Sequence, residues 1–282
     1  MSARRDFLDL IRNQWAAGNF LCVGLDAVYS GLPPDLNRRY PPERALFVFN
    51  ADIIEATREF VCGYKFNPVF YLRHGAEGLA ALTNTLQHLR SVAPEKAVIL
   101  DAQLTGVSRT NEAAWTFVRE CLRYVDAITV MAIAGRDAFA ALLDQPGLGV
   151  LAVCRTSGAG ANEFQDYPVE GLPLYLRMAR AVGRDWNRRG NCGLVMGTDN
   201  LTALRRVRQH VPQLPLLILG MGERGEDAAA VVEVGRGRDG PNFILSLGRD
   251  VIHTSFGTDY AQTAGRAART FNDRINSELL QF

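Results

Sequence analysis

Eight short apolar runs recur along the whole chain, and segments with helical spacing separate them. The runs are five to seven residues long and apolar almost throughout, which is typical of strands that are buried on both faces. Residues 42–60 and 75–92 carry apolar residues at helical spacing, and a capped helix is expected near Thr198. The eight predicted strands are residues 20–26, 62–67, 97–103, 127–131, 149–155, 192–197, 215–221 and 242–248.

This alternation predicts an α/β protein built as one (β/α)8 TIM barrel over residues 1–282. An amphipathic helix is expected at residues 3–17, ahead of the first strand. The main alternative is an open, doubly wound sheet, but no GxGxxG motif follows the first strand. No linker, repeat or low-complexity segment divides the sequence, so a single domain is predicted.

The composition excludes several classes of function. Lys and Arg number 31 against 30 Asp and Glu, so no global basic field for nucleic acid is expected. No apolar run is long enough to span a bilayer, and the first residues lack a signal-peptide core. The five cysteines form no CxxC pair, which argues against zinc or a disulfide framework. These features predict a cytoplasmic protein without membrane or nucleic-acid partners.

Charged residues follow the first three predicted strands. Asp26, Lys65 and Asp101 each stand at a strand end, and the carboxyl ends of barrel strands are where such folds gather their chemistry. Adjacent strand ends should bring the three groups within hydrogen-bonding distance of one another. Two carboxylates beside one ammonium can orient sugar hydroxyls or tune a proton donor. The simpler alternative is a structural ion pair at the barrel mouth.

A phosphate site is predicted after the seventh and eighth strands, in “GMGERG” and “LGRD”. Many barrels bind phosphate at this position with backbone N–H groups exposed by glycines and with one basic side chain. Gly222 and Gly248 supply the backbone, and Arg249 supplies a forked, charge-assisted contact. The alternative is that the glycines only make turns and that Arg249 pairs with Asp250.

A further set of segments, spread in order along the chain from about residue 15 to 275, is “LCVGLD”, “FNADIIEATREFVCGYKFNPVFYLRHGAEGLAAL”, “VILDA”, “DAITV”, “GVLAVCRTSGAGANEFQD”, “GLVMGT” and “LGMGERGED”. Together these segments resemble the orotidine 5'-phosphate decarboxylase family, in its longer bacterial branch. The resemblance implies the barrel fold, a nucleoside 5'-monophosphate as the ancestral ligand, and a homodimer whose barrels pack mouth to mouth. No metal or other cofactor is expected.

The resemblance gives roles to the residues at the strand ends, and it also reveals departures. Asp26 resembles the family's acid for the ribose hydroxyls, Lys65 the lysine that ends strand two, and Asp101 the first acid of the family motif Asp-x-Lys-x-x-Asp. In this sequence Gln103 replaces the lysine of the motif and Gly106 replaces its second acid. Asp101 therefore lacks the two charged partners that the motif provides.

The resemblance also covers the predicted base and phosphate contacts. Ser157, with Thr156 before it, resembles the serine that reads the pyrimidine edge. Arg249 resembles the phosphate-binding arginine, and Gly222 resembles part of the phosphate-loop backbone. Arg224 replaces the glutamine of the phosphate lid, which adds a cation to the expected phosphate site.

These departures predict an enzyme with altered chemistry. The main hypothesis is an enzyme that acts on a 5'-phosphorylated nucleoside or related sugar phosphate, in a nucleoside natural-product pathway. Lys65, Asp101 and Asp26 would be its catalytic residues, and efficient orotidylate decarboxylation is not expected. Gln103 and Thr110 are expected near the substrate, with Thr110 in the segment that reaches across the dimer. One alternative is a nucleotide-binding protein without turnover. Another is a true orotidine 5'-phosphate decarboxylase in which Lys65 is the surrogate proton donor.

Overall fold

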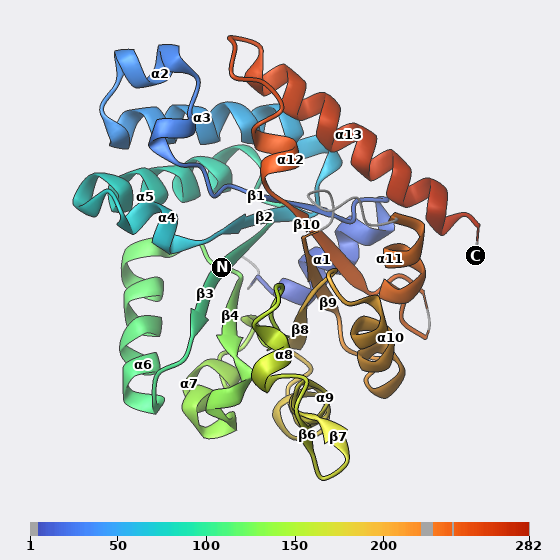
Figure 1. Ribbon diagram of the computed structural model, residues 1–282. Helices are drawn as coiled ribbons and strands as arrows, with labels where there is room; N and C mark the ends of the chain where they lie inside the picture. Colours follow the sequence, from blue (N-terminus) through green and yellow to red (C-terminus); the bar gives the residue numbers. More distant parts are fainter. Residues whose placement is uncertain (1–4, 221–227, 239, 282) are drawn as a thin grey trace.

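Eight parallel strands form a closed barrel in the order β1-β10-β9-β8-β5-β4-β3-β2 (Figure 1). The structure is a computed structural model that describes residues 5–220, 228–238 and 240–281. The expected single (β/α)8 barrel is confirmed, and all eight predicted strands are present. The strands are β1 (Leu21–Gly24), β2 (Gly63–Phe66), β3 (Ala97–Leu104), β4 (Ala127–Met131), β5 (Gly149–Arg155), β8 (Cys192–Gly197), β9 (Leu216–Leu219) and β10 (Phe243–Leu247).

Helices surround the barrel and connect its strands (Figure 1). The capped helix expected near Thr198 begins at Leu201, where the side chain of Asn200 accepts a hydrogen bond from Ala203 N. The helices are α2 (Pro34–Arg39), α3 (Pro42–Thr57), α4 (Pro68–Leu72), α5 (Gly75–Val92), α6 (Ser108–Phe117), α7 (Ala140–Leu143), α8 (Ala161–Phe164), α9 (Leu174–Ala181), α10 (Leu201–His210), α11 (Ala228–Gly235), α12 (Arg249–Ile252) and α13 (Tyr260–Leu279), with a small hairpin of β6 (Pro168–Val169) and β7 (Leu172–Pro173) before α9. In the described residues, no helix has the length and apolar character needed to cross a membrane.

Side chains alternate between the barrel interior and the surrounding helices, as the period of two of a strand requires. On β3, Ile99 belongs to the interior cluster, whereas Val98 and Leu100 pack against the helices. On β5, Leu151 and Val153 likewise point inward. The next inward positions beyond these apolar residues are polar, and they face the carboxyl-end mouth of the barrel. They include Asp101, Thr129, Arg155 and Ser246, all buried.

The N-terminal helix α1 (Phe7–Ala16) closes the opposite end of the barrel. Phe7 and Ile11 are fully buried and pack with the interior strand residues. Gly149 at the start of β5 makes room for the Phe7 ring, which a Cβ at that position would overlap. The helix begins at Phe7 rather than at residue 3, because Asp6 is its N-cap and accepts hydrogen bonds from Leu8 N and Asp9 N.

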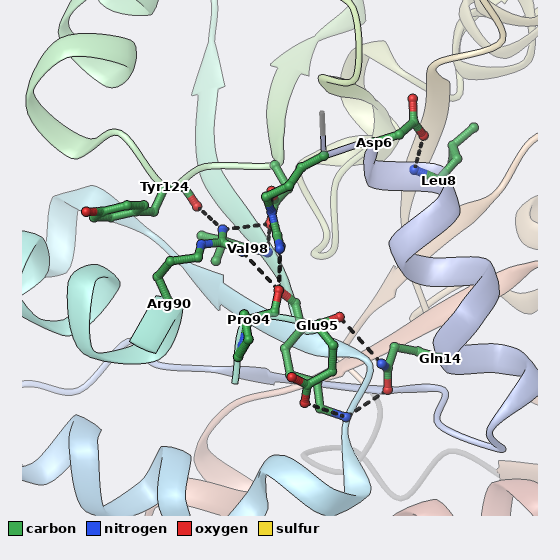
Figure 2. A network of polar contacts seen from close by, with 11 residues as sticks. Asp6, Leu8, Gln14, Arg90, Pro94, Glu95, Val98 and Tyr124 are labelled. Carbon is green, nitrogen blue, oxygen red and sulfur yellow. Dashed lines mark hydrogen bonds and ion pairs between the residues drawn. The ribbon is translucent and has the colours of Figure 1, made fainter. Parts of the chain in front are cut away.

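A polar network attaches α1 to the strands at this N-terminal end (Figure 2). The carboxylate of Asp126 pairs with Arg5, at 2.9 Å from Nε to Oδ1, and with Arg90, at 3.1 Å from Nη2 to Oδ2. Lys96 donates from Nζ to Gln14 Oε1 at 2.7 Å. Because these groups come from α1, α5 and the segments just before α1, β3 and β4, the network holds together elements that are distant in the sequence.

Candidate active site

A cavity of about 520 Å³ opens at the carboxyl ends of the strands. Its walls come from β1, β2, β3, β9, β10 and the segments that follow them. Volumes of this size are usual for small-molecule sites, and this end of the barrel is where such sites occur. Five residues singled out from the sequence line the cavity, namely Asp26, Lys65, Asp101, Gly248 and Arg249.

The charged group from β1 to β3 forms a compact cluster. Lys65 Nζ lies 2.7 Å from Asp26 Oδ2 and 3.1 Å from Asp101 Oδ2. The Lys65 side chain is only 9% exposed, and that of Asp101 is 5% exposed. Burial alone would lower the pKa of Lys65, but the attraction and hydrogen bonds of Asp26 and Asp101 outweigh it, so the pKa is raised. Lys65 is therefore an ammonium held between two carboxylates at the cavity wall.

Neutral groups complete the surroundings of the two carboxylates. Thr129 Oγ1 donates to Asp101 Oδ1 at 2.9 Å, and Gln103 Nε2 reaches the same oxygen at 3.5 Å. Asn67 N donates to Asp26 Oδ1 at 2.7 Å. Asp101 is thus satisfied by Lys65 and Thr129 even though the lysine of the motif is replaced by the Gln103 amide.

Gln103 has an unusual backbone conformation. Its φ is +46°, in the left-handed region that non-glycine residues rarely adopt, and its N–H donates to Thr129 Oγ1 at 2.9 Å. A bulge in the pairing of β3 with β4 lies between Leu100 and Leu104. The bulge and the strained residue turn the last part of β3 at the mouth, so the Gln103 side chain is exposed there.

The segment around Gly106 has packed to fit a glycine. A Cβ at Gly106 would lie 2.8 Å from both Cβ and Cγ2 of Thr110, closer than side chains approach. Asn111 Nδ2 donates to Gly106 O and Ala138 O, which holds this turn in place. An acid at position 106 would therefore need the backbone or Thr110 to move. Thr110 itself is exposed, and it does not line the cavity.

The expected base-reading residues lie on the opposite wall of the mouth. β5 is four strands from β1 in either direction around the barrel, and Ser157 follows it as an exposed residue. Thr156 N donates to Gln165 Oε1 at 2.7 Å. Neither residue lines the cavity, so a ligand would have to span the mouth to reach from Arg249 to Ser157. Gly222 and Arg224 lie outside the described residues.

Sequence reasoning missed a second ion-pair cluster at the end of β5. Arg155 is 3% exposed, and it pairs bidentately with Asp166 at 2.9 and 3.1 Å. Its Nη1 lies 2.9 Å from Asp199 Oδ2, at the end of β8. The available signal was Arg155 itself, a charge on the last inward position of an otherwise apolar strand. Its partners are 11 and 44 residues away, and no local pattern predicts them.

His253 also lines the cavity, and the sequence patterns predicted no role for it. Its ring stacks on Phe49 and Phe256, with centroids 6.0 and 5.7 Å apart. Burial and then the charge of Arg249 lower the pKa of His253. The imidazole is therefore neutral at pH 7 and forms an aromatic floor near Arg249.

The fold and its mouth define a (β/α)8 barrel with a ligand-sized cavity in which one ammonium lies between two carboxylates. Residues 19–255 match the family described as Orotidine 5'-phosphate decarboxylase / HUMPS family. The chain belongs to this family, as the resemblance of its motifs indicated.

Named relatives match over nearly the full length of the chain. Orotidine 5'-phosphate decarboxylase of Cellvibrio japonicus is 34% identical, covering 96% of this chain and 98% of its own. The enzyme of the same name from Thermomicrobium roseum is 39% identical, covering 91% and 90%. Among solved structures, OMP decarboxylase of Leishmania donovani superposes with a TM-score of 0.84 at 29% identity, covering 98% of this chain and 99% of its own.

Proposed function

We propose that the chain is a lyase that decarboxylates orotidine 5'-phosphate or a closely related pyrimidine nucleotide, with Lys65 as the proton donor. The observation that carries this proposal is the buried Lys65 ammonium between Asp26 and Asp101 at the cavity wall. Relatives of the same length that are named as this decarboxylase support it. These relatives support true orotidylate decarboxylation better than the altered chemistry that was the main hypothesis from the sequence.

The ligand would lie across the mouth. Its phosphate would sit at Gly248 and Arg249, and Asp26 would accept from the ribose hydroxyls. The cavity is lined by β1, β2, β3, β9 and β10, and Ser157 follows β5 on the opposite side of the mouth. With the phosphate and ribose in the cavity, the base would extend across the mouth toward Ser157. This orientation places the reacting ring carbon near Lys65 and Asp101.

Decarboxylation breaks the bond between the ring and its carboxylate and leaves an electron pair on the ring carbon. Asp101 beside the substrate carboxylate disfavours the bound ground state through like-charge repulsion, while the Lys65 ammonium stabilises the developing carbanion. The raised pKa of Lys65 makes it a weak acid. A ring carbanion is a far stronger base than an amine, so transfer of the proton from Nζ remains favourable.

The replacements in the motif limit the rate. Gln103 cannot supply a proton at neutral pH, and Gly106 supplies no charge. Loss of one positioned general acid costs on the order of 10² to 10⁴ in rate. Turnover is therefore expected to be slow compared with an enzyme that has both lysines.

A second candidate function rests on the same two positions. The neutral Gln103 amide and the packed Gly106 turn favour a phosphorylated nucleoside without a ring carboxylate, on which a different bond is broken. Asp26, Lys65 and Asp101 would then perform the acid–base steps. The two candidates predict different products from different nucleotides.

The direct test is incubation of the purified protein with orotidine 5'-phosphate in D2O, followed by mass spectrometry. Decarboxylation yields uridine 5'-phosphate with one deuterium on the ring carbon. A panel of other nucleoside monophosphates and sugar phosphates is treated in the same way. Unchanged orotidine 5'-phosphate, together with a mass change in another compound, would establish the second candidate instead. Tight binding without any conversion would indicate a nucleotide-binding protein.

We also propose a homodimer formed through one side of the mouth. Four exposed apolar side chains follow the adjacent strands β2, β3 and β4, namely Val69 at 67%, Leu72 at 52%, Val107 at 72% and Ile133 at 61% exposure. Apolar groups gathered on one face are typical of interaction surfaces. Light scattering of the purified protein tests this, and Val107→Glu is expected to yield monomer.

The free cysteines, four of them buried, support a reducing, cytoplasmic compartment.

A further inference from the structure

The Arg155 cluster holds the segment after β5 against the end of β8. Arg155 Nη2 also donates to Asn162 Oδ1 at 3.1 Å, so the guanidinium contacts the segment at two points. Asp199 Oδ2 accepts from Arg155 and from Gly158 N, at 2.9 and 3.4 Å. Ser157 lies between these contacts, and its place at the mouth therefore depends on them.

The second oxygen of Asp199 has a different environment. Oδ1 is buried and lacks a hydrogen-bond partner within the described part of the chain. A Cβ placed on Gly197 would lie 2.5 Å from this oxygen and 2.9 Å from Ser157 Cβ. The free carboxylate oxygen and the serine side chain therefore pack against the same side of Gly197. Buried carboxylate oxygens require a donor. The Ser157 hydroxyl makes no hydrogen bond to this oxygen in the structure, but rotation of the neighbouring serine side chain would bring it there.

We propose that Asp199 determines which base edge the site accepts, by accepting the Ser157 hydroxyl proton on Oδ1. Once that proton is committed, the Ser157 oxygen can only accept a hydrogen bond from the ligand. A ring that presents an N–H donor, as the imide of a uracil-type base does, is then favoured. A cytosine-type ring, which presents an unprotonated nitrogen at this position, is disfavoured. This inference rests on the proposed function, in which Ser157 faces the base.

Asp199→Asn is the informative change. Arg155 retains the side-chain oxygen, so the amide NH2 takes the place of Oδ1. The amide then donates to Ser157, and the serine proton is released toward the ligand. The expected result is a lowered or reversed preference for the uracil-type base, because the serine changes from acceptor to donor.

Asp166→Asn is the matched control. Asp166 shares Arg155 with Asp199, but it approaches the guanidinium through Nε and Nη2, whereas Asp199 uses Nη1. The Asp166→Asn substitution therefore weakens the same cluster without changing the Asp199 carboxylate beside Ser157. Both variants are checked for an intact fold by thermal unfolding before binding is measured.

The experiment is calorimetric titration with uridine 5'-monophosphate and cytidine 5'-monophosphate. Wild type should bind the uridine compound about tenfold more tightly, equivalent to roughly one hydrogen bond. Asp199→Asn should lower or invert this ratio, while Asp166→Asn weakens both ligands alike. Ser157→Ala, at an exposed position, leaves the Arg155 contacts intact and should bring the ratio of the two affinities to about one.

Three results would overturn the inference. The first is an unchanged ratio in Asp199→Asn together with normal uridine 5'-monophosphate binding by wild type, which leaves the proposed function standing. The second is retention of the ratio by Ser157→Ala, which remains decisive if Asp199→Asn fails to fold. The third is wild-type protein that binds neither nucleotide, which removes the proposed function as well.

Discussion

Each of the two ends of the barrel holds a partly buried cluster of three charged residues, and the charge signs are inverted between the ends. At the mouth, the Lys65 ammonium lies between the carboxylates of Asp26 and Asp101. At the N-terminal end, the carboxylate of Asp126 lies between the guanidinium groups of Arg5 and Arg90. Both clusters join strands or helices that are distant in the sequence. They differ in what the remaining hydrogen-bonding groups contact.

At the N-terminal end the backbone uses those remaining groups. Asp126 Oδ2 also accepts from Val98 N at 2.9 Å, and Arg90 Nη2 donates to Tyr124 O at 2.8 Å. At the mouth, two of the three Lys65 donors go to carboxylates, and the group lines the 520 Å³ cavity. In (β/α)8 barrels the first arrangement is typical of stability and the second of ligand binding. The comparison predicts that changes at the two ends affect different measurements.

Lys65→Ala should produce the largest effect on turnover. The change removes the proposed proton donor and leaves Asp26 and Asp101 facing each other across the cavity wall. A loss of at least about 10³-fold in kcat/KM for orotidine 5'-phosphate is expected, within the range for removal of a positioned general acid. Lys96→Ala is the matched control, because Lys96 is the chain's other lysine and lies at the N-terminal end. Equal losses in both variants would remove the functional distinction between the ends.

Asp126→Ala should produce the largest effect on stability. It leaves Arg5 and Arg90 without their shared carboxylate and Val98 N without its acceptor. Breaking a buried ion pair by removing one partner costs about 3 to 5 kcal/mol. The free energy of unfolding from urea titration should fall by about this amount, while kcat/KM of the folded protein stays within about twofold. A large fall in kcat/KM without loss of stability would contradict the assignment of this end.

The two lysines should respond to pH in opposite directions. The folded-state pKa of Lys65 is raised, so the stability it contributes is fully present below about pH 10.4, the usual lysine pKa, and is lost as pH rises through the folded-state value. Burial lowers the pKa of Lys96, so charging it opposes folding. This cost is full below the folded-state pKa, falls as pH rises above it, and is gone above about pH 10.4, the usual lysine pKa.

The measurement is the free energy of unfolding of wild type, Lys65→Met and Lys96→Met between pH 7 and 11. The stability of wild type relative to Lys65→Met should decrease at the alkaline end. Its stability relative to Lys96→Met should increase over the same range. The same trend in both pairs would show that the two ends do not differ in electrostatic character.

The barrel could be predicted from the sequence because its signal is local. Each strand is an apolar run of its own, and the observed strands lie within one or two residues of the predicted ones, as β5 at Gly149–Arg155 illustrates. The positions of Asp26, Lys65 and Asp101 in one cluster followed from the order of adjacent strands. Geometry of this kind needs only the fold and the strand ends.

The remaining features depend on contacts between distant segments. Arg155 meets Asp199 across 44 residues, and Arg5 meets Asp126 across 121. The packing of Thr110 against Gly106 could not be predicted either, because it depends on how the turn before α6 closes. The left-handed backbone of Gln103 likewise depends on the bulge in β3. These four features concern the mouth or the N-terminal end, where tertiary contacts decide side-chain positions.

Gln103→Lys should have the smallest effect, and it tests whether the mouth works with one ammonium. A lysine there could reach Asp101 Oδ1, where the Gln103 amide lies at 3.5 Å, and would compete with Lys65 for that carboxylate. No acid is added at Gly106, whose turn is packed against Thr110. The expected change in kcat/KM for orotidine 5'-phosphate is therefore less than about tenfold. An increase of 10²-fold or more would be at the low end of what a positioned general acid contributes. It would mean that the proton donor belongs at position 103 and that Lys65, like Asp126 at the other end, mainly holds its neighbours in place.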